Sequence, residues 1–253
     1  MNALGMELRK IKRRRFWLMA AGAAGLELTW VAAATGKRAG SAAEQRLLGL
    51  SLNESLSLCA MVMPLVAALL ASRLATVDTE ERMGRLLTAL GQRGTARFDA
   101  KLALGSVVVA LGQASLLAFI ALAGPGMGLR PTAAYRDSLW PALVVMLAAS
   151  VAATAVQLAL ATCVDKQGVG LAAGALAGVL CSGLPSAHLE ALGWLLPWGV
   201  AVAGNPFSSL ASFRAHAPVA VAHPWAGALF AVIAAAVWVV AARLAVIHKE
   251  NHR

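Results

Sequence analysis

The stretch VVVALGQASLLAFIALA, residues 107–123, decides the fold class. It carries no charge, and its apolar residues follow one another without alternating with polar ones. A strand of a membrane barrel would alternate between the two kinds, so the stretch predicts a helix. Extended to 102–123, it is long enough to cross a hydrocarbon core of about 30 Å.

Five other stretches have the same character, and the composition agrees with a membrane location. Only 13% of the residues are charged and 59% are hydrophobic, whereas soluble proteins have about 25% charged residues. The expected spans are 16–34, 54–75, 102–123, 139–162, 168–187 and 225–247. The sequence therefore predicts an all-α membrane protein with one transmembrane domain over 1–253. The net charge of +10 comes from clusters beside the spans with no aromatic residues among them, which argues against nucleic-acid binding.

Charge placement predicts the orientation. With six spans and both termini in the cytoplasm, 16 of the 22 Lys and Arg lie inside. Counting 189–204 as a seventh span lowers that number to 14, so six spans are preferred. The segment 189–204 is also short for a span and contains Pro197 between Trp194 and Trp198, which favours a re-entrant or interfacial element on the outer side.

The basic N-terminus has three interpretations. Leu4, Leu8 and Ile11 are spaced to form one apolar side of a helix, with cations around the rest, as in a helix on the inner leaflet. The same cations can serve only as a topology anchor. The stretch also imitates a cleaved twin-arginine signal, but Glu27 and Trp30 are foreign to the apolar core of such a signal.

The stretch DTEERMGRLLTALGQRG, residues 78–94, predicts a short amphipathic helix between the second and third spans. Asp78 is suited to cap its start, with Glu81 as the acidic partner of a capping box, and Gly91 to close its end. One side carries an apolar stripe of Met83, Leu86, Leu87 and Leu90. A helix this short is marginal alone in water, so it docks onto a partner or rests on the lipid surface. Thr95 is the expected cap of the helix that leads into the third span.

In order and size the chain resembles the permease subunits of ABC transporters of the ABC-2 class. The resemblance lies in the basic start MELRKIKRRRFW, residues 6–17, and in TEERMGRLLTALGQRGTARFDAKL, residues 79–102. LPWG at 196–199 is similar to the outer segment of the lantibiotic and bacitracin immunity permeases within that class. The resemblance implies a type V exporter architecture, with a surface helix, a coupling helix after the second span and a re-entrant segment before the sixth.

The family implies two partners, a separate ATPase subunit and a second permease subunit, as a homodimer or a heterodimer, within the lipid of a bacterial inner membrane. The residues that would dock into the ATPase are Glu80, Glu81, Met83, Arg85, Leu86 and Leu90. The only Gly-Lys pair, Gly36 with Lys37, lacks the rest of a phosphate-binding loop. No cofactor is therefore expected in this chain, and ATP and Mg²⁺ belong to the partner. The expected cargo is an amphipathic substrate such as an antimicrobial peptide or drug, exported or extracted for self-immunity.

Two features inside the spans have both a functional and a packing interpretation. Glu27 is an ionisable residue within the first span, where it either lines the substrate path or is protonated or hydrogen-bonded to Gln113 or Gln157 for packing alone. Gly170, Gly174 and Gly178 form a ridge that lets another helix approach closely, either in this chain or in a second permease subunit. Asn53 and Glu54 are expected at the solvated outer rim.

Two other classes of protein compete with the permease. Glu80, Glu81 and Arg85 form Glu-Glu-x-x-x-Arg, as in CAAX-type intramembrane metalloproteases, but those enzymes need histidines in later spans, where this chain has none. An accessory membrane protein without transport would show no nucleotide dependence. His248 and His252 are spaced like metal ligands at a charged chain end, where solvation is expected and no metal site.

Overall fold

The computed structural model describes residues 3–12, 15–80, 94–164 and 166–252. The described chain is all-helical, with two isolated β-bridges, Leu47 with Arg130 and Phe207 with Ala220. The long helices are α2 (Phe16–Ala39), α3 (Leu48–Glu80), α5 (Gly94–Gly126), α6 (Ala133–Cys163), α7 (Gln167–Gly183) and α10 (Pro224–Asn251). The short ones are α1 (Ala3–Lys12), η1 (Ala43–Gln45), η2 (Glu190–Leu195), α8 (Val200–Ala203) and α9 (Ser209–Ala215).

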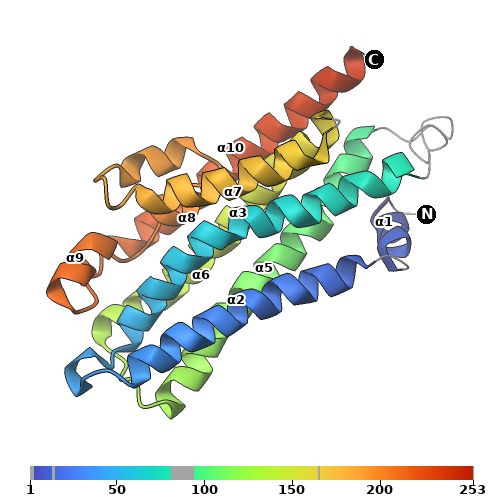
Figure 1. Cartoon of the computed structure of the whole chain (residues 1–253). Coiled ribbons are helices and arrows are strands. Elements are labelled where there is room, and N and C mark those ends of the chain that lie inside the picture. The colour runs from blue at the N-terminus through green and yellow to red at the C-terminus, as the bar shows by residue number, and fades with distance from the viewer. Residues whose placement is uncertain (1–2, 13–14, 81–93, 165, 253) are drawn as a thin grey trace.

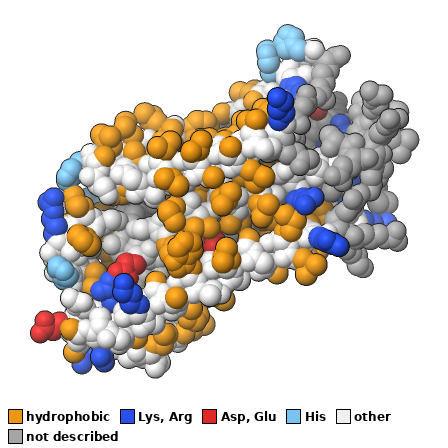
Figure 2. Space-filling view, in the orientation of Figure 1, with side chains coloured by type: hydrophobic (Ala, Val, Ile, Leu, Met, Phe, Trp, Pro, Cys, Tyr) orange, Lys and Arg blue, Asp and Glu red, His pale blue; other side chains and the backbone are white. Residues whose placement is uncertain are grey.

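The long helices lie side by side in one elongated bundle (Figure 1). α3 and α6 occupy its centre: 67% of the most apolar part of α6 is buried, against 22% for α2 and for α10. Small residues let α6 pack this closely, since Ala142, Ala149, Ala152 and Ala153 have no exposed surface. A broad band of apolar side chains covers the visible surface, and charged residues gather toward the two ends (Figure 2). This is the surface of a bundle surrounded by lipid.

Among the described residues, five helices are long and apolar enough to cross a membrane: α2, α3, α5, α6 and α10. The sixth predicted span, 168–187, is a helix of 17 residues that ends at Gly183 and belongs to the shorter apolar helices. The multi-pass character is confirmed, while the six-span layout remains a prediction. α2, α3 and α5 extend beyond the predicted 16–34, 54–75 and 102–123, because helical backbone continues past the apolar part of each sequence.

Local sequence accounts for several helix ends. The Thr132 hydroxyl accepts a hydrogen bond from the Tyr135 backbone N–H over 3.2 Å, which caps the start of α6. Pro224 is the first residue of α10, a position where its missing N–H costs nothing. At the far end of α10, Lys249 Nζ donates to the carbonyl oxygens of Thr162 and Cys163 over 2.9 Å each, so a cation caps the end of α6.

Both chain ends lie at the same end of the bundle as the last turn of α3 and the first turn of α5 (Figure 1). Arg243 of α10 pairs with Asp99 of α5 over 2.9 Å there. α1 forms a separate helix at this end, as predicted, and packs against α5. Its apolar side is divided, because Ile11 is buried in the protein whereas Leu4 and Leu8 are about two-fifths exposed.

Candidate functional site

Two long helices lead into and out of the predicted docking segment. α3 continues without a break through Asp78 to Glu80, so the prediction that Asp78 caps a new helix is wrong. Glu80 is the last residue of α3, and the other predicted docking residues lie outside the described residues: Glu81, Met83, Arg85, Leu86 and Leu90. α5 begins at Gly94, which places Thr95 inside its first turn and not at its cap. The chain between Glu80 and Gly94 is therefore joined on both sides to helices of 33 residues each.

The start of α5 also touches the end of α10. A Cβ atom at Gly94 would collide with the carboxylate of Glu250, so glycine permits this close approach.

A buried polar pair joins α2 to α5. Gln113 Nε2 donates a hydrogen bond to Glu27 Oε2 over 2.9 Å, and each side chain is only 1% exposed. The described neighbours provide no hydrogen-bond partner for Glu27 Oε1 or Gln113 Oε1. Of the two glutamines that the sequence offered as partners, Gln113 is therefore the one that bonds to Glu27.

Gln157, the other glutamine, lies in α6 and forms hydrogen bonds to α7 and to Trp198. With its amide oriented to satisfy both ends, its nitrogen donates to the Gly170 carbonyl over 3.1 Å. Its oxygen accepts from the Gly174 backbone N–H over 3.2 Å and from Trp198 Nε1 over 3.1 Å. Gly170 and Gly174 are one turn apart in α7, so the amide lies directly on the exposed backbone of that turn.

Trp198 belongs to the segment between α7 and α10, which doubles back on itself. Gly193 and Gly199 cross so closely that a Cβ on Gly199 would lie 2.6 Å from the Gly193 Cα. The turn between them carries LPWG, and α8 then packs against α3, α6 and α10. We call residues 184–204 the hairpin segment. Its contact with Gln157 places its tip against the central helix of the bundle.

The glycine ridge of α7 packs within the chain. A Cβ on Gly178 would lie 2.0 Å from the Met61 carbonyl oxygen, and one on Gly174 would lie 2.7 Å from the Pro64 carbonyl oxygen. Both contacts are with α3, and only glycine allows the two backbones to come this near. Gly170 has a looser environment, because a Cβ there would lie 3.9 Å from the Gln157 side-chain amide, an ordinary contact distance.

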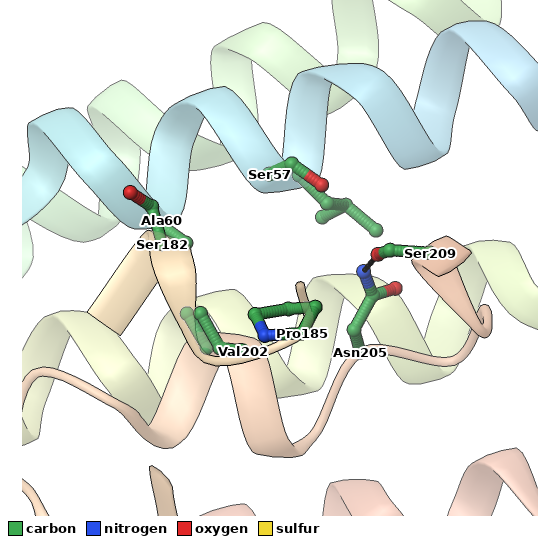
Figure 3. Close-up of a pocket in the computed structure, with 9 residues that line it drawn as sticks. Ser57, Ala60, Ser182, Pro185, Val202, Asn205 and Ser209 are labelled. Carbon is green, nitrogen blue, oxygen red and sulfur yellow. Dashed lines mark hydrogen bonds between the residues drawn. The ribbon is translucent and has the colours of Figure 1, made fainter. Parts of the chain in front are cut away.

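A small pocket of mixed polar and apolar lining lies toward the end of the bundle opposite the chain termini, between α3, the end of α7 and the chain around α8 and α9 (Figure 3). Ser57, Ser182, Pro185, Asn205 and Ser209 are among its lining residues. Its volume of about 20 Å³ is enough for about one water molecule. An amphipathic cargo does not fit there in this conformation.

Beside this pocket, Asn53 departs from the sequence-based prediction of a solvated rim. It is 7% exposed, and its Oδ1 accepts hydrogen bonds from Asn205 Nδ2 over 3.1 Å and Ser209 Oγ over 3.2 Å. Glu54, the next residue, is exposed as expected and pairs with Arg38 of α2. The sequence feature that could have predicted the contacts of Asn53 is an asparagine near the start of an apolar helix, because an amide in a membrane needs hydrogen-bond partners.

The bundle and its apolar surface define a multi-pass helical membrane protein. Residues 3–182 match the family model described as ABC-2 family transporter protein, which covers well over half of the chain. The chain belongs to this family and is the permease subunit of an ABC transporter. Members form the transmembrane component, in general without catalysis of their own, and work with an ATPase subunit. A search of curated proteins gave no match.

Proposed function

We propose that the chain exports or extracts an amphipathic substrate from the membrane, and that a separate ATPase drives this transport by binding residues 78–94. The observation that carries this proposal is the match to ABC-2 family transporters over residues 3–182, which contain the whole charged segment. The described geometry supports it. α3 and α5 meet the segment as long continuous helices, so a force on the segment would tilt both.

The docking surface in this proposal is formed by Glu80, Glu81, Met83, Arg85, Leu86 and Leu90. The apolar members would bury their side chains in a cleft of the ATPase, and the charged members would pair at its rim. ATP and Mg²⁺ would be bound by the partner.

For the cargo we propose an antimicrobial peptide of the lantibiotic kind, with self-immunity as the biological role. The support is the similarity of LPWG at 196–199 to the immunity permeases. Glu27 would join the substrate path only when α2 separates from α5, because the pair with Gln113 is now buried. A second permease subunit, identical or related, would complete the path. Gly170 faces Gln157 of α6, and Gly174 and Gly178 pack against α3, so the glycine ridge is occupied within the chain in this conformation.

The docking proposal is tested by purification of the tagged chain from its native host in a mild detergent. We expect an ATPase subunit to accompany the wild-type chain. Leu86→Asp should abolish the association, because an unpaired charge in a desolvated stripe costs on the order of several kcal/mol. Thr88→Asp adds the same charge on the side away from the apolar stripe, among the charged residues at the rim, and should weaken the association far less. Equal recovery of the ATPase with both variants would refute the docking assignment.

The cargo proposal needs a separate experiment. Deletion of the chain should sensitise its host to the lantibiotic that the host encounters or produces, and expression of the wild-type chain should restore resistance. Leu86→Asp should fail to restore it at equal membrane abundance. Unchanged sensitivity across a panel of lantibiotics would reject this substrate class while leaving the permease assignment intact.

A further inference from the structure

The pair formed by Glu27 and Gln113 is incomplete as a hydrogen-bonded unit. An amide and a carboxyl group can form two parallel hydrogen bonds, but the structure has one, from Gln113 Nε2 to Glu27 Oε2. The remaining oxygens, Glu27 Oε1 and Gln113 Oε1, are both buried and have no partner among the described residues. Two acceptors therefore lack a donor within the same pair.

An ionised carboxylate would make this arrangement unfavourable. A carboxylate can only accept hydrogen bonds, and a buried charge without a partner is expensive. The ion pairs between described residues join Lys10 with Glu7, Arg38 with Glu54 and Arg243 with Asp99. None of them involves Glu27.

In the part of the chain that the structure describes, no ion pair joins Glu27 to a basic residue of α1, α3 or α5. α3 contributes the buried thiol of Cys59 near Glu27, and α5 contributes the uncharged amide of Gln113. α1 contacts α2, whose start follows it in the chain, and in α1 Glu7 and Lys10 pair with each other over 2.7 Å.

We propose that Glu27 is a proton-binding site and that it is neutral in this conformation. The carboxylate takes up one proton from water, and the resulting O–H donates to Gln113 Oε1. Gln113 Nε2 donates to the other carboxyl oxygen, so one proton satisfies both orphaned acceptors and closes α2 on α5 with two hydrogen bonds.

The site then couples protonation to the separation of the two helices. If α2 moves away from α5, the carboxyl group meets water and releases its proton, and the freed carboxylate presents a negative charge. The inference concerns the closed pair and does not depend on the identity of the cargo or of the ATPase.

Infrared spectroscopy of the purified full-length chain in lipid nanodiscs tests the proposal directly. At neutral pH the wild-type chain should show the carbonyl stretch of a protonated carboxylic acid, sensitive to hydrogen–deuterium exchange. Glu27→Gln should lose this band completely. Glu7→Gln is the matched control, since among the described glutamates Glu7 is also nearly inaccessible, at 2% exposure, but it is paired with Lys10. That control should keep the band.

A second measurement, thermal stability as a function of pH, distinguishes loss of the proton site from misfolding of the variant. Glutamine can both donate and accept, so Glu27→Gln should fold and keep two hydrogen bonds to Gln113. The wild-type chain should lose thermal stability as pH rises from acidic values to neutrality and beyond, because over that range its folded form retains a proton that the unfolded form has released. Glu27→Gln should lack this loss. A wild-type spectrum without the acid band at neutral pH, or the same pH profile in both proteins, would overturn the proposal.

Discussion

Trp198 Nε1 donates a hydrogen bond over 3.1 Å to the side-chain oxygen of Gln157, a residue distant from it in the sequence. The same amide bonds to the backbone of α7 at Gly170 and Gly174. One buried side chain of the central helix therefore holds α7 and the hairpin segment together. Inside a bilayer such an arrangement resists separation, because water is absent to replace the lost hydrogen bonds.

The first prediction concerns the energy of this contact. Trp198→Phe removes the donor and Gln157→Leu removes the acceptor, and the double variant completes a thermodynamic cycle. We expect a coupling of about 0.6 kcal/mol, within the range of up to about 1.7 kcal/mol found for hydrogen bonds between membrane helices. Unfolding of the purified chain in mixed micelles measures it. Strictly additive effects of the two substitutions would mean that the residues do not interact.

The second prediction concerns the approach of α7 to α3. Gly178→Ala would bring a methyl group against the Met61 carbonyl, where there is no room, and should cost about 1–3 kcal/mol of stability. Gly183→Ala on the same helix meets no atom within 4 Å. It should be neutral, or slightly stabilising because alanine favours helix. Melting temperatures of both variants in detergent provide the comparison, and a Gly178→Ala variant as stable as wild type would contradict the packing.

The third prediction separates a buried contact from an exposed one at neighbouring positions. Asn53→Ala leaves Asn205 and Ser209 without their shared acceptor and should cost about 1–3 kcal/mol. Glu54→Gln weakens a partly exposed ion pair with Arg38 and should cost less than about 1 kcal/mol. Chemical unfolding curves decide between them. A larger loss of stability for Glu54→Gln than for Asn53→Ala would contradict this prediction.

The apolar runs were sufficient to predict most of the bundle, and the physical reason is the cost of unpaired backbone in lipid. The boundaries were less accurate. Hydropathy ends near Ala75 because charged residues follow, but the backbone of α3 remains helical to Glu80. An acidic residue such as Asp78 is compatible with a helix interior as well as a cap, and only the path of the chain distinguishes the two.

The polar contacts were predictable in part. Gln113 was one of the two glutamines predicted as possible partners of Glu27, because all three are polar residues in apolar spans, and the structure selects it. The roles of Gln157 and Asn53 were missed, because Trp198, a partner of Gln157, and Asn205, a partner of Asn53, lie on the chain between α7 and α10, whose fold depends on contacts between distant residues. The crossing of Gly193 and Gly199, which positions Trp198, leaves no periodic signal in the sequence.

The last prediction concerns sidedness, on which the coupling mechanism depends. Cys59 and Cys181 are buried, so replacing Cys163 with serine leaves a background suited to labelling. In this background Thr88→Cys should react with a membrane-impermeant maleimide only after the cells are permeabilised, because most Lys and Arg lie on that side of the spans.

Ala43→Cys, on an exposed turn at the other end of the bundle, is the control and should react in intact cells. The pair of variants fixes the orientation independently of any partner. Labelling of Thr88→Cys in intact cells would place residues 78–94 outside, where a cytoplasmic ATPase has no access to them, and the coupling proposal would fail.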